Sequence, residues 1–192
     1  NGGLATSEGS PTCNSPLAEG KGWMYEGGTR EPLLVSWPGV IEPGSVSSGT
    51  ITSPDFYPTI LELTGADPDP EQHVDGTSFA NLLKGNTGDV RGPMYWHYPH
   101  YGNQGGTPGA SVRDRDWKLI RFFEDGHEEL YNLKEDIGET KNLADEEPEK
   151  RAELSGLLTG WQGEIEALIP QPNPDYVPWE GREPCAHFAP KN

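Results

Sequence analysis

Long hydrophobic runs, clustered basic residues and metal-binding cysteine patterns are all missing from this sequence of 192 residues. No apolar run approaches the roughly eighteen residues that a membrane-spanning helix needs, so we expect no membrane span. The two cysteines, Cys13 and Cys185, lie far apart and follow neither zinc-site nor Cys-x-x-Cys spacing. They could pair in an oxidising compartment or remain two free thiols, and the sequence leaves both possibilities open.

Positive charge is also scarce, because 14 Lys and Arg stand against 31 Asp and Glu, a formal net charge of −17. Such a surface repels phosphate backbones, so nucleic acid is not an expected partner. The same field repels sulfated polymers. A basic residue that binds an anion must therefore act locally, inside a pocket.

The most informative stretch runs from Gly20 to Pro32 and reads G-K-G-W-M-Y-E-G-G-T-R-E-P. Glycine on both sides of Lys21 lets the backbone lie close to a ligand and presents the ammonium group as a compact charge, which suits an anion. From charge and spacing alone, a solvated lysine in a flexible turn is the simpler interpretation. Arg30 stands near Glu26 and Glu31. It could touch a substrate, but we expect ion pairing there to fix the loop.

In the first half of the chain, composition and spacing predict short elements separated by loops. The apolar run 33–37 indicates a buried strand that stops at Pro38-Gly39, and a short strand is expected at 50–52. Ser53 or Asp55 should cap a helix with an apolar face that ends at Gly65, followed by a short helix over 78–83.

The second half has the pattern of an antiparallel sheet. Short β-prone runs occupy 94–97, 110–113, 117–122 and 129–133, with hairpin turns at 114–116 and 124–126. Residues 147–168 have the periodicity of one amphipathic helix. We therefore predict a four-stranded antiparallel sheet packed by a C-terminal helix. The proline-rich tail, 170–192, should run extended over the surface or be disordered.

His97 and His100 lie within W-H-Y-P-H-Y-G-N-Q-G-G. In a continuous strand, residues three apart face opposite sides, but Pro99 breaks the strand, so both rings could converge on one cleft. Aromatic residues with polar tips beside histidines suit a sugar or an aryl ring. The alternative is that Tyr95 and Trp96 pack in the core and the histidines bond backbone groups. Metal binding by this pair is not expected, because no carboxylate or cysteine nearby completes a ligand set.

With Asn1-Gly2-Gly3 some twenty residues upstream, the Lys21 motif closely resembles the type I sulfatases of the alkaline phosphatase superfamily. Segments at 53–65, 75–78, 117–120 and 129–133 recur in sulfatases in the same order. The resemblance spans nearly the whole chain, to about residue 174.

This resemblance implies an α/β fold in which residues 1–90 are the C-terminal part of the large sulfatase domain. Residues 91–169 would form a smaller subdomain of sheet and helix, and 170–192 a tail. It further implies that Lys21 contacts the sulfate group, that Asn1 is a calcium ligand, and that the region of His97 and His100 borders the active-site mouth. A periplasmic or secreted location is expected from the family.

The resemblance also implies groups that this sequence lacks. The family converts the first residue of a C-x-P-x-R or S-x-P-x-R motif to formylglycine, and neither cysteine stands in that context. The chain does not begin with Met, and in the family an aspartate that also binds calcium precedes the Asn. We therefore expect the C-terminal portion of a longer enzyme, with the formylglycine nucleophile upstream, and no sulfatase activity from the 192 residues alone.

The expected activity is hydrolysis of sulfate esters, of a carbohydrate rather than of a small aryl compound. The carbohydrate preference rests on the polar and aromatic loop 96–104. Two alternatives remain open. One is a phosphonate or phosphodiester hydrolase of the same superfamily, because a lysine in a glycine loop does not distinguish sulfate from phosphate. The other is a non-catalytic carbohydrate-binding module left after loss of the catalytic half.

Overall fold

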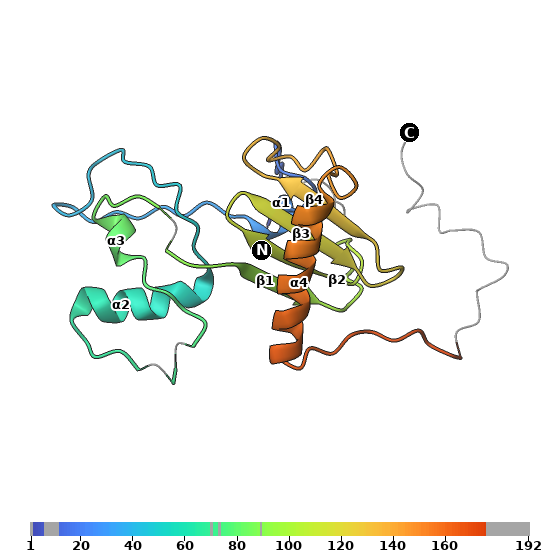
Figure 1. Ribbon diagram of the computed structural model, residues 1–192. Coiled ribbons are helices and arrows are strands. Elements are labelled where there is room, and N and C mark those ends of the chain that lie inside the picture. Colours follow the sequence, from blue (N-terminus) through green and yellow to red (C-terminus); the bar gives the residue numbers. More distant parts are fainter. Residues whose placement is uncertain (1, 6–11, 70, 73, 89, 176–192) are drawn as a thin grey trace.

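The computed structural model describes residues 2–5, 12–69, 71–72, 74–88 and 90–175, and they form two parts (Figure 1). One part is an antiparallel sheet with a long helix lying across it, and the other is a lobe of short helices to its left in Figure 1. In chain order the elements are α1 (Glu26–Thr29), the 3-10 turn η1 (Ser53–Asp55), α2 (Phe56–Thr64), α3 (Ala80–Leu83), β1 (Met94–Tyr98), β2 (Gly109–Asp114), β3 (Trp117–Phe122), β4 (Glu128–Asn132) and α4 (Pro148–Glu164).

The four strands pair with their sequence neighbours in the order β1-β2-β3-β4, all antiparallel. Asp114 pairs with Trp117, so a two-residue turn joins β2 to β3, and Arg115 has the positive φ that such a turn requires. A longer turn joins β3 to β4, where the Phe122 amide donates to the His127 carbonyl at 3.0 Å. The predicted four-stranded sheet and both hairpin turns are therefore confirmed.

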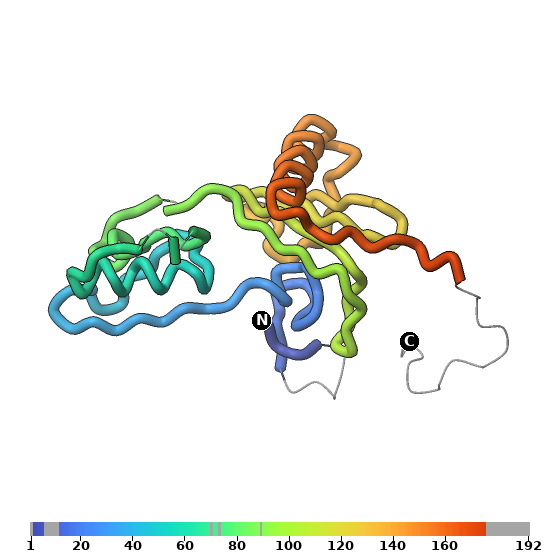
Figure 2. The backbone as a smooth tube through the Cα atoms, turned by 90° about the horizontal axis from the view of Figure 1, so that it is seen from below, coloured from blue at the N-terminus to red at the C-terminus, as the bar shows by residue number. Residues whose placement is uncertain are grey.

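Strand alternation gives the sheet a separate apolar layer on each face. One face packs under α4, and the ring of Tyr95 stacks on Trp161 with centroids 4.8 Å apart. The opposite face carries Ile120, Phe122 and Tyr131, which pack against Met24 of the N-terminal segment. Figure 2 shows α4 on one side of the sheet and the N-terminal loops on the other. The buried residues under α4 are Ala110, Val112, Leu119, Leu130, Ala144, Leu154 and Leu158.

Helix α4 covers the sheet as predicted, but it ends at Glu164 and not at Leu168. Gly160 and Gly163 lie in its last turns and weaken the helix there. Ile165 and Leu168, which the periodicity placed on the buried face, are 49% and 84% exposed. The helix therefore buries its apolar side only where the sheet lies beneath it.

The prediction of a buried strand at 33–37 is wrong in this structure. The segment has no regular structure, and Leu34 is 94% exposed. Among the described residues, nothing forms backbone hydrogen bonds with 33–36, and an apolar run becomes a strand only beside a partner strand. The strand expected at 50–52 is also absent, because Thr52 instead precedes η1.

The lobe is organised by the buried carboxylate of Asp55 more than by an apolar core. Asp55 accepts from the amides of Thr52 at 2.6 Å and Thr77 at 2.8 Å. It also pairs with Arg91 at 2.8 Å. These contacts join the start of α2 to the segment before α3, so the two predicted helices form with their expected order. Gly65 ends α2 with a positive φ, as predicted.

Several predicted features lie outside the described residues, namely Asn1, Cys185 and the tail from 176 onward. Cys13 is exposed, and whether it pairs with Cys185 stays a prediction. Within the described ranges, no helix is both long and apolar enough to cross a bilayer.

Candidate functional site

The lysine loop, residues 18–23, is held in place through its backbone. The Lys21 amide donates to the Gly3 carbonyl at 3.0 Å, and the Trp23 amide donates to Gly20 at 3.0 Å. The Asn14 side-chain amide donates to the carbonyls of Gly3 and Glu19, at 2.8 and 2.9 Å. The loop is thus tied to the segment that directly follows Asn1. The backbone of Lys21 is therefore close to Gly3, while Asn1 itself lies outside the described residues.

Two glycines of α1 let this helix touch the loop directly. A Cβ on Gly27 would lie 2.2 Å from the Ala18 carbonyl oxygen, and one on Gly28 would lie 2.2 Å from the Trp23 carbonyl oxygen. Both distances are far too short for any side chain. The helix and the lysine loop therefore meet backbone against backbone.

The histidine loop, residues 99–107, lies against the other side of the lysine loop. A Cβ on Gly106 would lie 2.2 Å from the Gly22 carbonyl oxygen, and one on Gly22 would lie 3.1 Å from the Gly105 carbonyl oxygen. His100 is exposed in this loop, with its ring edge-on to Tyr98 at 5.3 Å. The structure thus brings the loop of His100 next to the loop of Lys21.

His97 lies elsewhere, on the sheet face that α4 covers. Its Nε2 is 3.1 Å from the Leu168 carbonyl oxygen, and its Nδ1 is 3.2 Å from the Gln162 side-chain amide. Its ring lies 5.4 Å from that of Phe123. The structure does not bring His97 together with the lysine loop, which packs on the opposite face. Substrate contact by His97 and His100 stays a prediction.

The Lys21 ammonium forms no ion pair with another of the described residues. Within the described part of the chain, no carboxylate lies within ion-pairing distance of it, and the residue is only partly buried. An unpaired, partly desolvated ammonium on a rigid loop suits an anionic ligand. This geometry fits the predicted sulfate contact without testing it.

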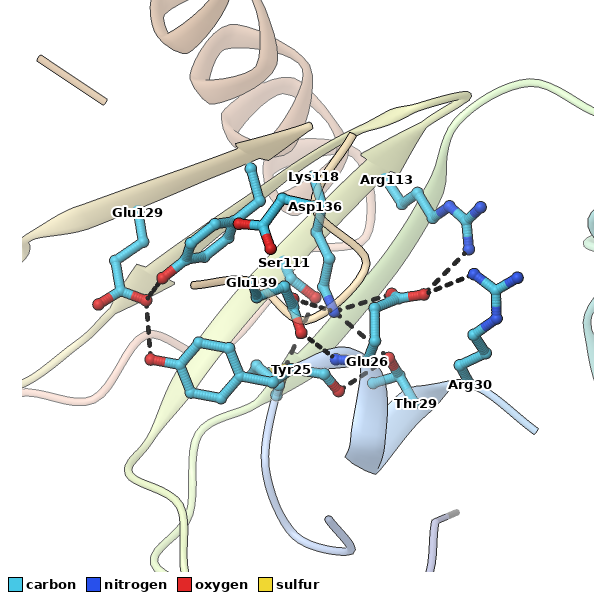
Figure 3. Close-up of polar contacts among 12 residues, drawn as sticks. Tyr25, Glu26, Thr29, Arg30, Ser111, Arg113, Lys118, Glu129, Asp136 and Glu139 are labelled. Carbon is cyan, nitrogen blue, oxygen red and sulfur yellow. Dashed lines mark hydrogen bonds and ion pairs between the residues drawn. The ribbon is translucent and has the colours of Figure 1, made fainter. Parts of the chain in front are cut away.

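Next to the loop lies an ion cluster with a buried centre and an exposed edge at Arg30, which we call the Glu26 cluster: Glu26, Arg30, Arg113, Lys118 and Glu139. Lys118 Nζ lies 3.0 Å from Glu26 Oε1 and 3.0 Å from Glu139 Oε1, and all three side chains are 0–1% exposed. Arg30 and Arg113 approach Glu26 Oε2 at 3.3 Å each. Figure 3 shows the Lys118 amine between the two carboxylates, with both guanidinium groups beyond Glu26. The predicted ion pair of Arg30 with Glu26 is confirmed.

The two carboxylates of the cluster differ in their electrostatics. Burial raises the pKa of Glu26, but Lys118 and Arg113 outweigh it, so the net pKa lies below its usual value. Burial also raises the pKa of Glu139, and Lys118 offsets this only in part, so its net pKa is raised. The Glu139 Oε1 contact with Lys118 is close but poorly aligned for a hydrogen bond. Glu139 therefore depends on the charge of Lys118 more than Glu26 does.

A second polar contact ties the lysine loop to the sheet. Tyr25 donates to Glu129 Oε2 at 2.7 Å (Figure 3), and Tyr131 donates to the same oxygen at 2.8 Å. Burial, then donation to this carboxylate, raises the pKa of both phenols well above the ordinary value. The two rings meet edge to face at 6.3 Å. The segment that follows Lys21 is thus fixed to β4 as well as to β3.

A complete metal site does not occur within the described ranges. No group of three or more His, Cys, Asp or Glu side chains there could hold an ion. Calcium binding through Asn1 therefore stays a prediction.

Sequence reasoning missed the roles of Lys118 and Glu139. A signal for Lys118 was present, because it alternates with Trp117 and Leu119 and shares a face with Ile120 and Phe122. A lysine on an apolar strand face is buried only if it is paired. Its partners, however, are 92 and 21 residues away in sequence, and only the fold brings them together.

Comparison with known proteins assigns the family. The sequence profile of N-sulphoglucosamine sulphohydrolase, C-terminal, matches residues 19–159. The chain is 40% identical over 166 residues to a sulfatase of Formosa agariphila, covering 79% of this chain and 30% of that protein. It is 34% identical to an N-acetylglucosamine-6-O-sulfatase of Bacteroides thetaiotaomicron, covering 72% and 26%. It is also 36% identical to human arylsulfatase A, covering 68% and 29%.

A solved structure gives the same result. A protein in complex with its substrate D-glucosamine-2-N,6-O-disulfate superposes with a TM-score of 0.56 at 30% identity, covering 68% of this chain and 27% of that one. The chain thus spans about 30% of the length of the curated relatives it matches. The match in sequence and fold confirms the resemblance of the Lys21 motif. This chain belongs to the sulfatase family and corresponds to its C-terminal region.

Proposed function

We propose that this chain is part of a sulfuric ester hydrolase that acts on sulfate esters of a carbohydrate, with Lys21 contacting the sulfate group. The observation that carries the proposal is the Lys21 ammonium itself. It has no carboxylate partner among the described residues, and backbone contacts on both sides hold its loop in place. The net charge of −17 makes a local cationic site necessary for any anionic substrate.

The chemistry of ester cleavage needs groups that these residues do not supply. Sulfur must be attacked by a nucleophile, the charge on the sulfate oxygens must be neutralised, and the leaving oxygen must be protonated. In our proposal the formylglycine nucleophile lies in polypeptide outside this sequence. Calcium would be held by Asn1 together with ligands from the same outside polypeptide. This chain contributes the lysine loop and one wall of the substrate site.

A carbohydrate substrate is favoured by the aromatic side chains near the histidine loop. Tyr98 and Tyr101 are 42% and 70% exposed, and the Tyr101 hydroxyl reaches Glu124 at 2.6 Å. Exposed rings with polar tips suit the faces and hydroxyls of a sugar. Two relatives point the same way, because one is named an N-acetylglucosamine-6-O-sulfatase and another was solved with a glucosamine disulfate.

The test uses an active enzyme that contains this chain together with its upstream polypeptide. Lys21→Met should lower kcat/KM for a 6-O-sulfated glucosamine by about a hundredfold or more, because a charge-assisted contact to the sulfate is lost. Lys134→Met, a change at an exposed lysine, is the matched control and should retain wild-type turnover.

Other substrates decide between the alternatives. Preferential turnover of a phosphodiester or a phosphonate would contradict the proposal. So would sugar binding by an enzyme that cleaves no sulfate ester under any condition. The 192-residue chain alone should show no turnover of an aryl sulfate, and measurable turnover would mean that the nucleophile lies within it.

A further inference from the structure

The Glu26 cluster lies directly behind the lysine loop. Glu26 is the first residue of α1 and follows Lys21 by only five positions. Its backbone amide donates to Glu139 Oε2 at 2.6 Å, while its carboxylate receives Lys118 at 3.0 Å. Glu26 is thus held at both its main chain and its side chain. The start of α1 is therefore fixed to β3 and to the segment after β4.

Helix α1 meets the lysine loop through backbone atoms on both sides of Lys21. Gly27 and Gly28 contact the backbone of Ala18 and Trp23, and the Gly27 amide donates to the Ala18 carbonyl at 2.8 Å. No flexible side chain lies between helix and loop at these two points. Close-packed backbone atoms transmit small displacements because they have no room to absorb them.

Lys118 is the group that links the two carboxylates. Glu26 also has Arg30 and Arg113, but Glu139 has no other cation among the described residues. A buried ion network is not needed for stability, since well-packed apolar residues often serve as well. Because the Glu26 cluster adjoins the candidate anion-binding loop, it can instead serve to fix the position of that loop.

We propose that Lys118 is a positioning residue for Lys21, acting through Glu26 and α1 to hold the ammonium where a sulfate group would bind. The inference rests on the proposed function for the ligand of Lys21. The effect of Lys118 on the order of the lysine loop does not depend on that function. Lys118 touches no substrate. Its effect is confined to the orientation and rigidity of the lysine loop.

The test is amide hydrogen exchange by NMR on the 192-residue chain, comparing the double variant Lys118→Met/Glu139→Gln with the wild type. The double variant removes one charge of each sign, leaves Glu26 its two arginines, and keeps a carbonyl oxygen that can accept from Glu26. The probes are the amides of Lys21, Trp23 and Gly27, which are all hydrogen-bonded. We expect them to exchange about tenfold to a hundredfold faster under native conditions.

The matched control is Arg121→Met/Glu128→Gln. Arg121 lies on β3, as Lys118 does, but on the opposite face, against α4, and it pairs at 2.9 Å with Glu128 of β4. This control variant should speed up exchange of the lysine-loop amides no more than exchange of the amides of Leu119 and Leu130. Unchanged loop exchange in the Lys118 variant, or equal acceleration in the control, would overturn the proposal. If the double variant does not fold, Glu139→Gln alone is measured, and the same two outcomes decide.

A second arm separates this inference from the proposed function. In an active enzyme that contains this chain, the Lys118 variant should lower kcat/KM for a sulfate ester by about tenfold, and the Arg121 control should not. Faster loop exchange in a protein that hydrolyses no sulfate ester would leave the positioning role intact and reject the sulfatase activity.

Discussion

The sheet unit, residues 94–164, and the α2 lobe, residues 31–91, contain the same kinds of apolar residues but bury them to different extents. In the sheet unit, Val112, Leu119 and Leu130 are completely buried. In the lobe, Leu34 and Val46 are 94% and 95% exposed. A cavity of about 740 Å³ opens between the parts, lined by the lobe, by residues 14–17 and α1, and by Met94, Trp96 and Arg113. Burial therefore depends on whether a partner surface is present, and composition alone does not decide it.

The two regions are also held together by different kinds of interaction. The sheet unit is held by apolar layers on both faces of the sheet. The lobe is held mainly by Asp55 with Arg91 and the amides around it. Exposed apolar patches of this kind mark interaction sites in soluble proteins.

The largest expected effect comes from removing a leucine of the sheet unit. Leu130→Ala should lower the free energy of unfolding by about 2–5 kcal/mol, because a fully buried side chain leaves a cavity beneath α4. Leu34→Ala is the matched change in the lobe and should stay within about 0.5 kcal/mol. Urea denaturation followed by circular dichroism measures both. Equal losses would mean that the lobe buries Leu34 in solution.

A smaller and more local effect is expected in the lobe. Arg91→Met leaves the buried Asp55 carboxylate without its cation, which should destabilise the lobe by about 1–3 kcal/mol. Amides of α2 should then exchange faster in hydrogen-exchange experiments, while those of β3 keep their rates. Lys84→Met removes an exposed pair at 3.8 Å in the same lobe and is the control. Acceleration in β3 as well would show that the two parts unfold together.

The smallest effect is a pH dependence where the sheet unit meets the lysine loop. Tyr25 and Tyr131 have pKa values raised above 10 in the folded state, so the folded protein holds these protons more tightly than the unfolded chain. Their contribution is complete below about pH 10 and is lost as the pH rises above it. Urea midpoints should therefore fall above pH 10, and less steeply in Tyr25→Phe/Tyr131→Phe. Identical slopes in both proteins would contradict the assigned contacts.

Sequence reasoning succeeded where the relevant contacts are close in the chain. The hairpin at Arg115 and the helix over the sheet follow from local alternation and periodicity, and neighbouring strands pair with one another. The pair of Arg30 with Glu26 is four residues apart and was also predicted. The apolar run 33–37 was misjudged because a sequence pattern records a tendency to be buried, but not whether a covering surface is present.

The candidate site was predicted in part for the same reason. The glycine-flanked Lys21 was singled out from its motif, and in the structure its loop touches the histidine loop where Gly22 meets Gly106. The sequence left open whether His97 faces a cleft or bonds backbone groups. Alternation along β1 puts it with Tyr95 on the face beneath α4, where its Nε2 lies 3.1 Å from the Leu168 carbonyl oxygen. Lys118 was not recognised, because its carboxylate partners come from distant segments.

Because the lysine loop and the histidine loop contact through their backbones, the side chains of one loop can change while the other keeps its position. Gly22, Gly105 and Gly106 let the two loops touch mainly through main-chain atoms. In our proposal, side chains of the histidine loop contact the sugar, and they can therefore be substituted without moving the Lys21 ammonium that would bind the sulfate. Recognition of a new glycan would then require a different histidine loop on an unchanged lysine loop.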